Sequence, residues 1–237
     1  MRGHYAEICP SALLQCLHNG GMAFLDPHTP APSIPATVYA HRRQALAQKM
    51  GAGSVAIIPT APEQTRNRDA HFAYRADSYF YYLTGFEEAH AWLVLEGGTG
   101  RSTLLCQPKD LAREIWDGYR YGPKAAKAAL GFDAAYPIEQ LARKLPELLV
   151  DRDSLWHAFG HDADWDKRIA AALNDVRAQS RAGKRAPRSM HDLRTELDAM
   201  RLIKDDAEAG IQQRSADIAS AGHARAMSAC RPGMAEY

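Results

Sequence analysis

Residues 74–96 read YRADSYFYYLTGFEEAHAWLVLE, and the rest of the chain is organised around this stretch. Its first half is rich in aromatic residues, and its second half contains the apolar run AWLVL at residues 91–95, which two glycines bring to an end. A short apolar run with such boundaries is typical of a strand that is covered on both faces. We therefore expect this run, with Leu93 at its middle, to lie at the centre of a sheet.

Helix-like and strand-like segments alternate on both sides of this run. Residues 39–50 place apolar side chains on one side of a helix that Gly51 ends. Residues 54–59 predict a buried first strand, and residues 102–106 predict the second arm of a hairpin with the central run. The same reasoning predicts further helices at residues 123–130, 138–148 and 165–176, and one further strand at residues 155–158. This alternation predicts an α/β domain with a mixed sheet flanked by helices.

Composition excludes several classes of protein. The chain has 237 residues, of which 46% are apolar and 24% charged, so it holds one large domain, or one domain and part of another. Its net charge of +1 gives no basis for binding nucleic acid or an anionic membrane, and no apolar run approaches the roughly 18–20 residues of a membrane span. Cys9, Cys16, Cys106 and Cys230 are too irregularly spaced for a zinc cluster or a disulfide framework. We therefore expect reduced thiols in a cytoplasmic protein.

Metal-ligating residue types gather in the segment HAFGHDADWD, residues 157–166. His157, His161, Asp162 and Asp164 are all of ligand type, and imidazole with carboxylate suits a divalent transition metal. The two histidines, however, lie on either side of a strand end and a glycine turn rather than on one helical face. We therefore favour a turn in which an aspartate caps the next helix.

The sequence offers no nucleophile of recognisable geometry. It contains no Gly-x-Ser-x-Gly turn, and no cysteine has a histidine demonstrably placed to activate it. Cys106 alternates with Leu104 in a predicted strand, so we expect it to be a small buried apolar residue.

Three patterns resemble a known family. Residues 74–86 read Tyr-Arg-x-x-Ser-x-Phe-x-Tyr-x-Thr-Gly-Phe, residues 110–118 read DLAREIWDG, and residues 192–210 read DLRTELDAMRLIKDDAEAG. They resemble the N-terminal domain and interdomain connection of the aminopeptidase P (Xaa-Pro aminopeptidase) branch of the pita-bread metallopeptidases. The resemblance covers about residues 39–237. It implies the creatinase/aminopeptidase P type of N-terminal domain, followed by an incomplete pita-bread domain.

A domain organisation follows from this resemblance and from the proline-rich start of the chain. We expect a flexible extension at residues 1–36, the N-terminal domain at 37–190, a linker at 191–204 and the start of the pita-bread domain at 205–237. Asp205 and Glu208 form an Asp-x-x-Glu capping arrangement at the start of the last helix. A glycine inside a helix costs about 1 kcal/mol relative to alanine, and the remainder of that domain is missing here, so we expect only marginal helicity after Asp205.

The resemblance also implies an activity. Members of this family release an N-terminal residue that precedes proline, and they use two metal ions, usually manganese, held by five carboxylate and histidine ligands of the pita-bread domain. None of those ligand motifs occurs in this chain, so we expect it to contain no catalytic or metal-ligating residue and to be inactive alone. The implied partners are peptides with proline at the second position, without nucleic acid or membrane.

The resemblance further implies a homo-oligomer in which Trp116 contacts substrate in the active site of a neighbouring subunit. A tryptophan that lies in the core or at an interface, with no part in catalysis, is the other interpretation.

Two other functions stay open. The chain could be a stand-alone binding or oligomerisation module, although exposure of Met200, Ile203, Ile211 and Ile218 would argue against this. It could also be a relative that acts on another substrate, such as a prolidase or a creatine-hydrolysing enzyme. The patterns at residues 74–86 and 110–118 favour the aminopeptidase P branch.

Overall fold

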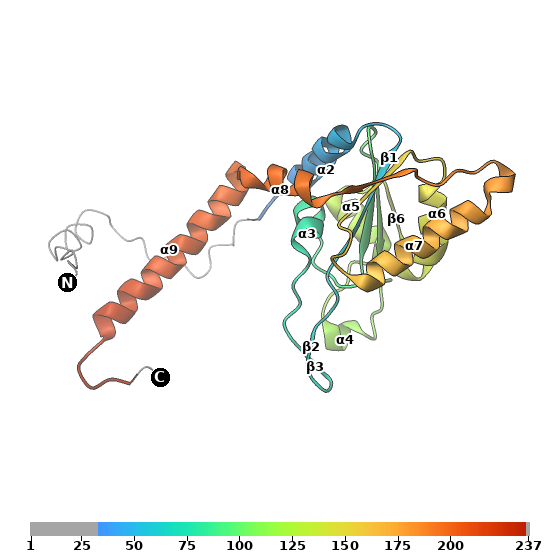
Figure 1. The fold of residues 1–237 in the computed structure, drawn as a ribbon. Helices are drawn as coiled ribbons and strands as arrows, with labels where there is room; N and C mark the ends of the chain where they lie inside the picture. The colour runs from blue at the N-terminus through green and yellow to red at the C-terminus, as the bar shows by residue number, and fades with distance from the viewer. Residues whose placement is uncertain (1–32, 236–237) are drawn as a thin grey trace, which may run out of the picture. The chain divides into compact units, whose positions relative to one another are not determined.

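A computed structural model describes residues 33–235 of the chain (Figure 1). Residues 34–203 form one compact unit, and residues 204–235 belong to a second unit, which is treated by itself below. The predicted extension, residues 1–36, lies outside the described residues except for its last four, and Ala36 opens the first described helix. Among the described residues, no helix has the length and apolar content needed to cross a membrane.

A six-stranded sheet forms the centre of the larger unit. Its order is β6-β5-β4-β1-β7-β8, and β4 runs antiparallel to both of its neighbours while the remaining pairs are parallel. The predicted mixed sheet, with the run around Leu93 inside it, is therefore confirmed. The strands are β1 (Ser54–Pro59), β4 (Trp92–Glu96), β5 (Ser102–Cys106), β6 (Ala134–Pro137), β7 (Ser154–His157) and β8 (Ser189–Asp192).

Helices cover both faces of this sheet (Figure 1). Residues of α2, α3, α5 and α8 share one buried cluster with the sheet, and residues of α6 and α7 share the other. The helices are α2 (Ala36–Met50), α3 (Ser78–Thr84), α4 (Glu114–Asp117), α5 (Gly122–Leu130), α6 (Leu141–Leu149), α7 (Ala163–Ala178) and α8 (Arg194–Leu202), with short 3₁₀ turns at Ile138–Gln140 and Ser180–Ala182.

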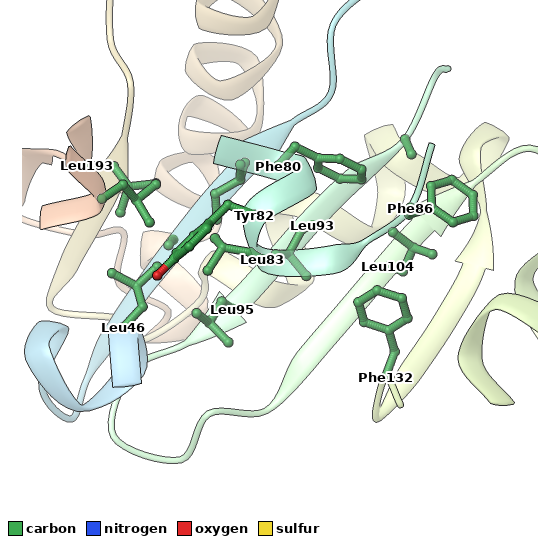
Figure 2. Close-up of a cluster of buried hydrophobic side chains, with 14 of the residues drawn as sticks. Leu46, Phe80, Tyr82, Leu83, Phe86, Leu93, Leu95, Leu104, Phe132 and Leu193 are labelled. Atoms are coloured by element: carbon green, nitrogen blue, oxygen red, sulfur yellow. The ribbon is translucent and has the colours of Figure 1, made fainter. Parts of the chain in front are cut away.

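Successive side chains of the strands point into these two clusters in turn. In β4, Leu93 and Leu95 enter the cluster beneath α3, whereas Trp92 and Val94 enter the cluster beneath α6 and α7. Successive side chains of a strand point to opposite faces, so an apolar run of this kind needs cover on both sides. Figure 2 shows the first cluster, in which side chains of α2 and α3 meet those of β4 and β5.

The aromatic half of residues 74–96 forms α3. Asp77 caps this helix, because its Oδ1 accepts hydrogen bonds from the backbone N–H groups of Tyr79 and Phe80 at 2.9 Å. Gly85 ends the helix with φ of 64°, and its N–H donates to the carbonyl of Tyr81. Asp77 and Gly85, both within residues 74–86, thus set the two ends of α3. Phe80 lies between them in the chain and is fully buried.

Several segments contain regular structure that their sequences do not predict, among them α3, α4 and β6. The polar stretch after β1 contains a small hairpin, β2 (Thr65–Asn67) and β3 (Ala70–His71). Residues 191–204, predicted to be a linker, contain the end of β8 and all of α8.

Contacts hold α8 firmly against the larger unit. Leu197 of α8 is buried in the cluster beneath α3. The Tyr79 hydroxyl donates to Oδ1 of Asp198 at 2.6 Å, and the Tyr82 hydroxyl donates to the carbonyl of Met200 at 3.2 Å. Most of the segment is therefore a helix packed against the larger unit.

The second unit contains α9 (Asp206–Ala229). The predicted capping box is confirmed: Oδ1 of Asp205 accepts from the N–H of Glu208, and the Glu208 carboxylate accepts from the N–H of Asp205. The helix is continuous through Gly210, and the expectation that it is only marginally stable stays a prediction. Its capping box and its many alanines favour the helix over the cost of that glycine.

We predict that Gly85→Ala destabilises the fold more than Gly183→Ala. Both glycines have left-handed φ angles, 64° and 80°, which cost another residue about 1–2 kcal/mol. A Cβ at Gly85 would also lie 2.4 Å from Cε2 of Tyr39, whereas one at Gly183 would meet nothing within 4 Å. We expect urea denaturation to give Gly85→Ala a further loss of about 1–3 kcal/mol, the usual cost of overpacking. Equal losses in the two variants would contradict this account of the α3 terminus.

Candidate functional site

The residues considered as metal ligands have structural roles in this fold. The imidazole of His157 is fully buried, and its Nδ1 donates to the carbonyl of Ile57 at 2.8 Å. Burial holds the pKa of His157 below its usual value, so the ring is neutral at pH 7. Its Nε2 lies 3.5 Å from Oδ1 of Asp166, and the ring of His161 lies against Trp165.

Asp162 is the cap of α7. Its Oδ1 accepts from the N–H groups of Asp164 at 2.8 Å and Trp165 at 3.1 Å, and Asp164 in turn pairs with Arg168. The favoured interpretation, a turn with a capping aspartate, is confirmed. Residues 33–235 contain no group of three or more His, Cys, Asp or Glu side chains that could hold a metal ion.

Cys106 lies inside the sheet with no exposed surface, as the sequence predicts. Burial raises the pKa of its thiol to about 12, so the reactive thiolate is not formed near neutral pH.

The loop between β5 and α5, residues 107–121, carries Trp116 and is called the Trp loop here. It contains α4 and lies beyond one end of the sheet (Figure 1). The exposed fraction of Trp116 is 86%, whereas that of Trp92 in the core is 6%. Other large apolar side chains of the loop are exposed as well, namely Leu111 (72%), Ile115 (80%) and Tyr119 (64%). An exposed apolar group of this kind is typical of a contact surface.

Polar contacts between residues of the Trp loop stabilise its conformation. The ammonium of Lys109 lies 2.5 Å from Oε1 of Glu114, donates to the carbonyl of Arg120 at 2.9 Å and sits 3.9 Å from the centre of the Tyr119 ring. Glu114 also accepts from the N–H of Arg120 at 2.9 Å. The hydrogen bond from Lys109 lowers the pKa of Glu114, so this carboxylate is charged at neutral pH.

The residues of the 110–118 pattern account for the loop's turns. Oδ1 of Asp110 accepts from the N–H groups of Ala112 and Arg113, which starts the turn into α4. Gly118 has φ of 84° and ends α4. Sequence reasoning identified Trp116 in this loop and used Glu114 as part of the family pattern, but it missed the ion pair between Lys109 and Glu114. The opposite charges of these two residues, on either side of the Asp110 turn, are the signal that could have found it.

Comparison with known proteins identifies the family to which this domain belongs. Residues 39–156 match the family model described as "Aminopeptidase P, N-terminal domain". The chain belongs to the aminopeptidase P family. The match includes α3, the hairpin of β4 and β5, and the whole Trp loop.

Relatives of known name support the assignment. The chain is 41% identical over 202 residues to "Xaa-Pro aminopeptidase" of Escherichia coli (strain K12), and the match covers 84% of this chain and 46% of that protein. It is 30% identical over 206 residues to "Xaa-Pro aminopeptidase" of Haemophilus influenzae, with coverage of 86% and 45%. The solved structure "Zn substituted E. coli Aminopeptidase P in complex with product" matches with a TM-score of 0.82 and 40% identity, covering 86% of this chain and 47% of that one. The chain thus spans a little under half the length of these relatives.

The metal of that solved structure has no counterpart among the described residues. A metal centre needs several converging carboxylate, imidazole or thiolate groups, and residues 33–235 provide no such group of three. The donor set of residues 33–235 of this aminopeptidase P chain therefore does not fit a bound metal.

We predict that Trp116→Ala leaves the stability of the chain unchanged. A side chain that is 86% exposed has few contacts to lose, so urea denaturation should shift by less than about 0.5 kcal/mol. The matched control is Trp92→Ala, which empties a core position and should cost about 3–5 kcal/mol. A comparable loss for Trp116→Ala would show that this tryptophan supports the fold.

Proposed function

We propose that this chain supplies the N-terminal lobe of an Xaa-Pro aminopeptidase, a hydrolase that releases an N-terminal residue preceding proline. The observation that carries the proposal is the match to Escherichia coli aminopeptidase P, with 40% identity and a TM-score of 0.82 over 86% of this chain. In this proposal residues 37–190 are the N-terminal domain, residues 191–204 connect it to the catalytic lobe, and residues 205–237 open that lobe. Residues 1–36 are an extension.

Catalysis in this proposal needs a second lobe, and the chain alone is inactive. The chain spans about half the length of its relatives, and its described residues do not fit a metal centre. Two manganese ions are the metals we propose for the complete enzyme. The apolar side chains of Ile218 and Met227 on α9, exposed by 55% and 67%, support further protein packing against this helix. Of the four residues whose exposure would argue against a stand-alone module, Ile203 and Ile218 are exposed, by 79% and 55%, whereas Met200 and Ile211 are half-buried. The argument against a stand-alone module therefore rests on Ile203 and Ile218.

We propose that Trp116 contacts the peptide substrate of a neighbouring subunit in a homo-oligomer. Its exposure supports this role, since large aromatic side chains are enriched where proteins meet. The bracing of the Trp loop by Lys109 and Glu114 supports it too, because a loop that is already ordered loses less entropy on binding.

The proposed location is the cytoplasm. The described cysteines, Cys106 and Cys230, are both free thiols, which is usual in a reducing compartment. The net charge of +1 supports peptides, rather than nucleic acid or an anionic membrane, as partners.

We predict that joining this chain to the second half of Escherichia coli Xaa-Pro aminopeptidase gives an enzyme that hydrolyses Xaa-Pro peptides in the presence of manganese. The chain alone should release no residue from the same peptides. A chimera that is folded and binds manganese but leaves Xaa-Pro peptides intact would contradict the proposed function.

We predict that Trp116→Ala in this chimera raises KM for the peptide about tenfold, the usual effect of losing a large aromatic contact. The matched control is Phe72→Ala, which removes another exposed aromatic side chain outside the Trp loop and should leave KM unchanged. Steady-state kinetics on both variants decides the role of Trp116. Equal KM values for the two variants would refute the proposed substrate contact.

A further inference from the structure

The two ends of the Trp loop are held by two consecutive residues, Glu88 and Ala89, which precede β4. At the start of the loop, Nε2 of Gln107 donates to the carbonyl of Ala89 at 3.4 Å. At its end, the N–H of Tyr121 donates to Oε1 of Glu88 at 2.6 Å. The loop is therefore closed at its base, as in compact surface loops whose ends lie close together.

Close packing at this base leaves little freedom. A Cβ added to Gly122, which has φ of 67°, would lie 2.8 Å from the backbone nitrogen of Lys109, so the two sides of the loop touch. The ring of Tyr121 lies 5.9 Å from that of the buried Phe86 and 5.3 Å from that of Tyr119. The base is ordered, while the apolar tip around Trp116 is exposed.

Glu88 is an unusual residue for this position. Its Oε2 is buried without a hydrogen-bond partner among the described residues, and burial raises the pKa of the carboxyl group. A buried carboxylate oxygen without a hydrogen-bond partner costs free energy, and the interactions of the other oxygen must offset that cost. Those interactions include the short hydrogen bond from Tyr121, and Arg120 and Lys109 lie close enough to favour the charged form.

We propose that Glu88 is the positioning residue of the Trp loop: its carboxylate holds the N–H of Tyr121, closes the base of the loop and so fixes the direction in which Trp116 is presented. This inference rests on the proposed role of Trp116 in contacting a substrate. Glu88 acts through Tyr121 and does not itself touch the peptide.

Hydrogen exchange on the chain as it stands tests the first half of the inference. Glu88→Ala should speed exchange of the Tyr121 amide at least tenfold, while Glu88→Gln, whose amide oxygen can accept the same bond, should retain most of the protection. Glu87→Ala is the matched control, because Glu87 is the exposed neighbour with the same charge, and it should change nothing. Amides of β4 should exchange at the wild-type rate in all three variants, which shows that the fold is intact.

A second pair of variants keeps the test decisive if Glu88→Ala unfolds the chain. Glu88→Asp keeps the charge but withdraws the carboxylate from Tyr121, so the Tyr121 amide should lose protection while Glu88→Gln keeps it. The inference is overturned if Glu88→Asp keeps protection and Glu88→Gln loses it, since charge alone would then matter. It is also overturned if Tyr121 exchanges at the same rate in every variant.

Kinetics of the chimera described above test the second half. Glu88→Ala should raise KM for the peptide, as Trp116→Ala does. The double variant should have the same KM as Trp116→Ala alone, because both changes act through one contact. Fully additive effects would overturn the link between Glu88 and Trp116. If Trp116→Ala leaves KM unchanged while Tyr121 protection still depends on Glu88, the substrate contact fails and the closure of the loop by Glu88 stands.

Discussion

The burial of β4 on both faces is the constraint on which the larger unit depends. Leu93 and Leu95 are fully buried on one side, and Trp92 and Val94 are buried on the other. Burying such side chains contributes about 1.5–3 kcal/mol each, so a sheet with only one covered face would lose much of its stabilisation. The helices on the two faces, and the loops that join them to the strands, follow from this requirement.

Sequence patterns were sufficient for the elements whose signals are local. The strands β1, β4 and β5 are short apolar runs with clear boundaries, and α7 has an apolar stripe that its structure buries. The strand β8 was not found, because all four of its residues are exposed and nothing in SMHD marks a strand. The packing of α8 cannot be predicted from local sequence either, because its buried residue Leu197 contacts residues far away in the chain.

The candidate site shows the same limit. Trp116 was identified through a family pattern, and the capping of α7 by an aspartate through helix-start chemistry; the structure shows that this aspartate is Asp162. Glu88 was not identified, because its partner Tyr121 is 33 residues away and no local periodicity connects them. Side chains of ligand type at residues 157–166 turned out to shape a turn, which illustrates why residue type without geometry is a weak guide to metal binding.

One consequence of the contacts around α8 concerns the meaning of the family pattern itself. Tyr82, a fixed position of the 74–86 pattern, lies against the buried cluster with its ring and reaches the Met200 carbonyl with its hydroxyl. A tyrosine is needed there for two reasons at once, since phenylalanine would fill the space but leave the carbonyl without that donor. In this chain the pattern therefore does more than build α3, because one of its side chains also anchors the C-terminal end of α8.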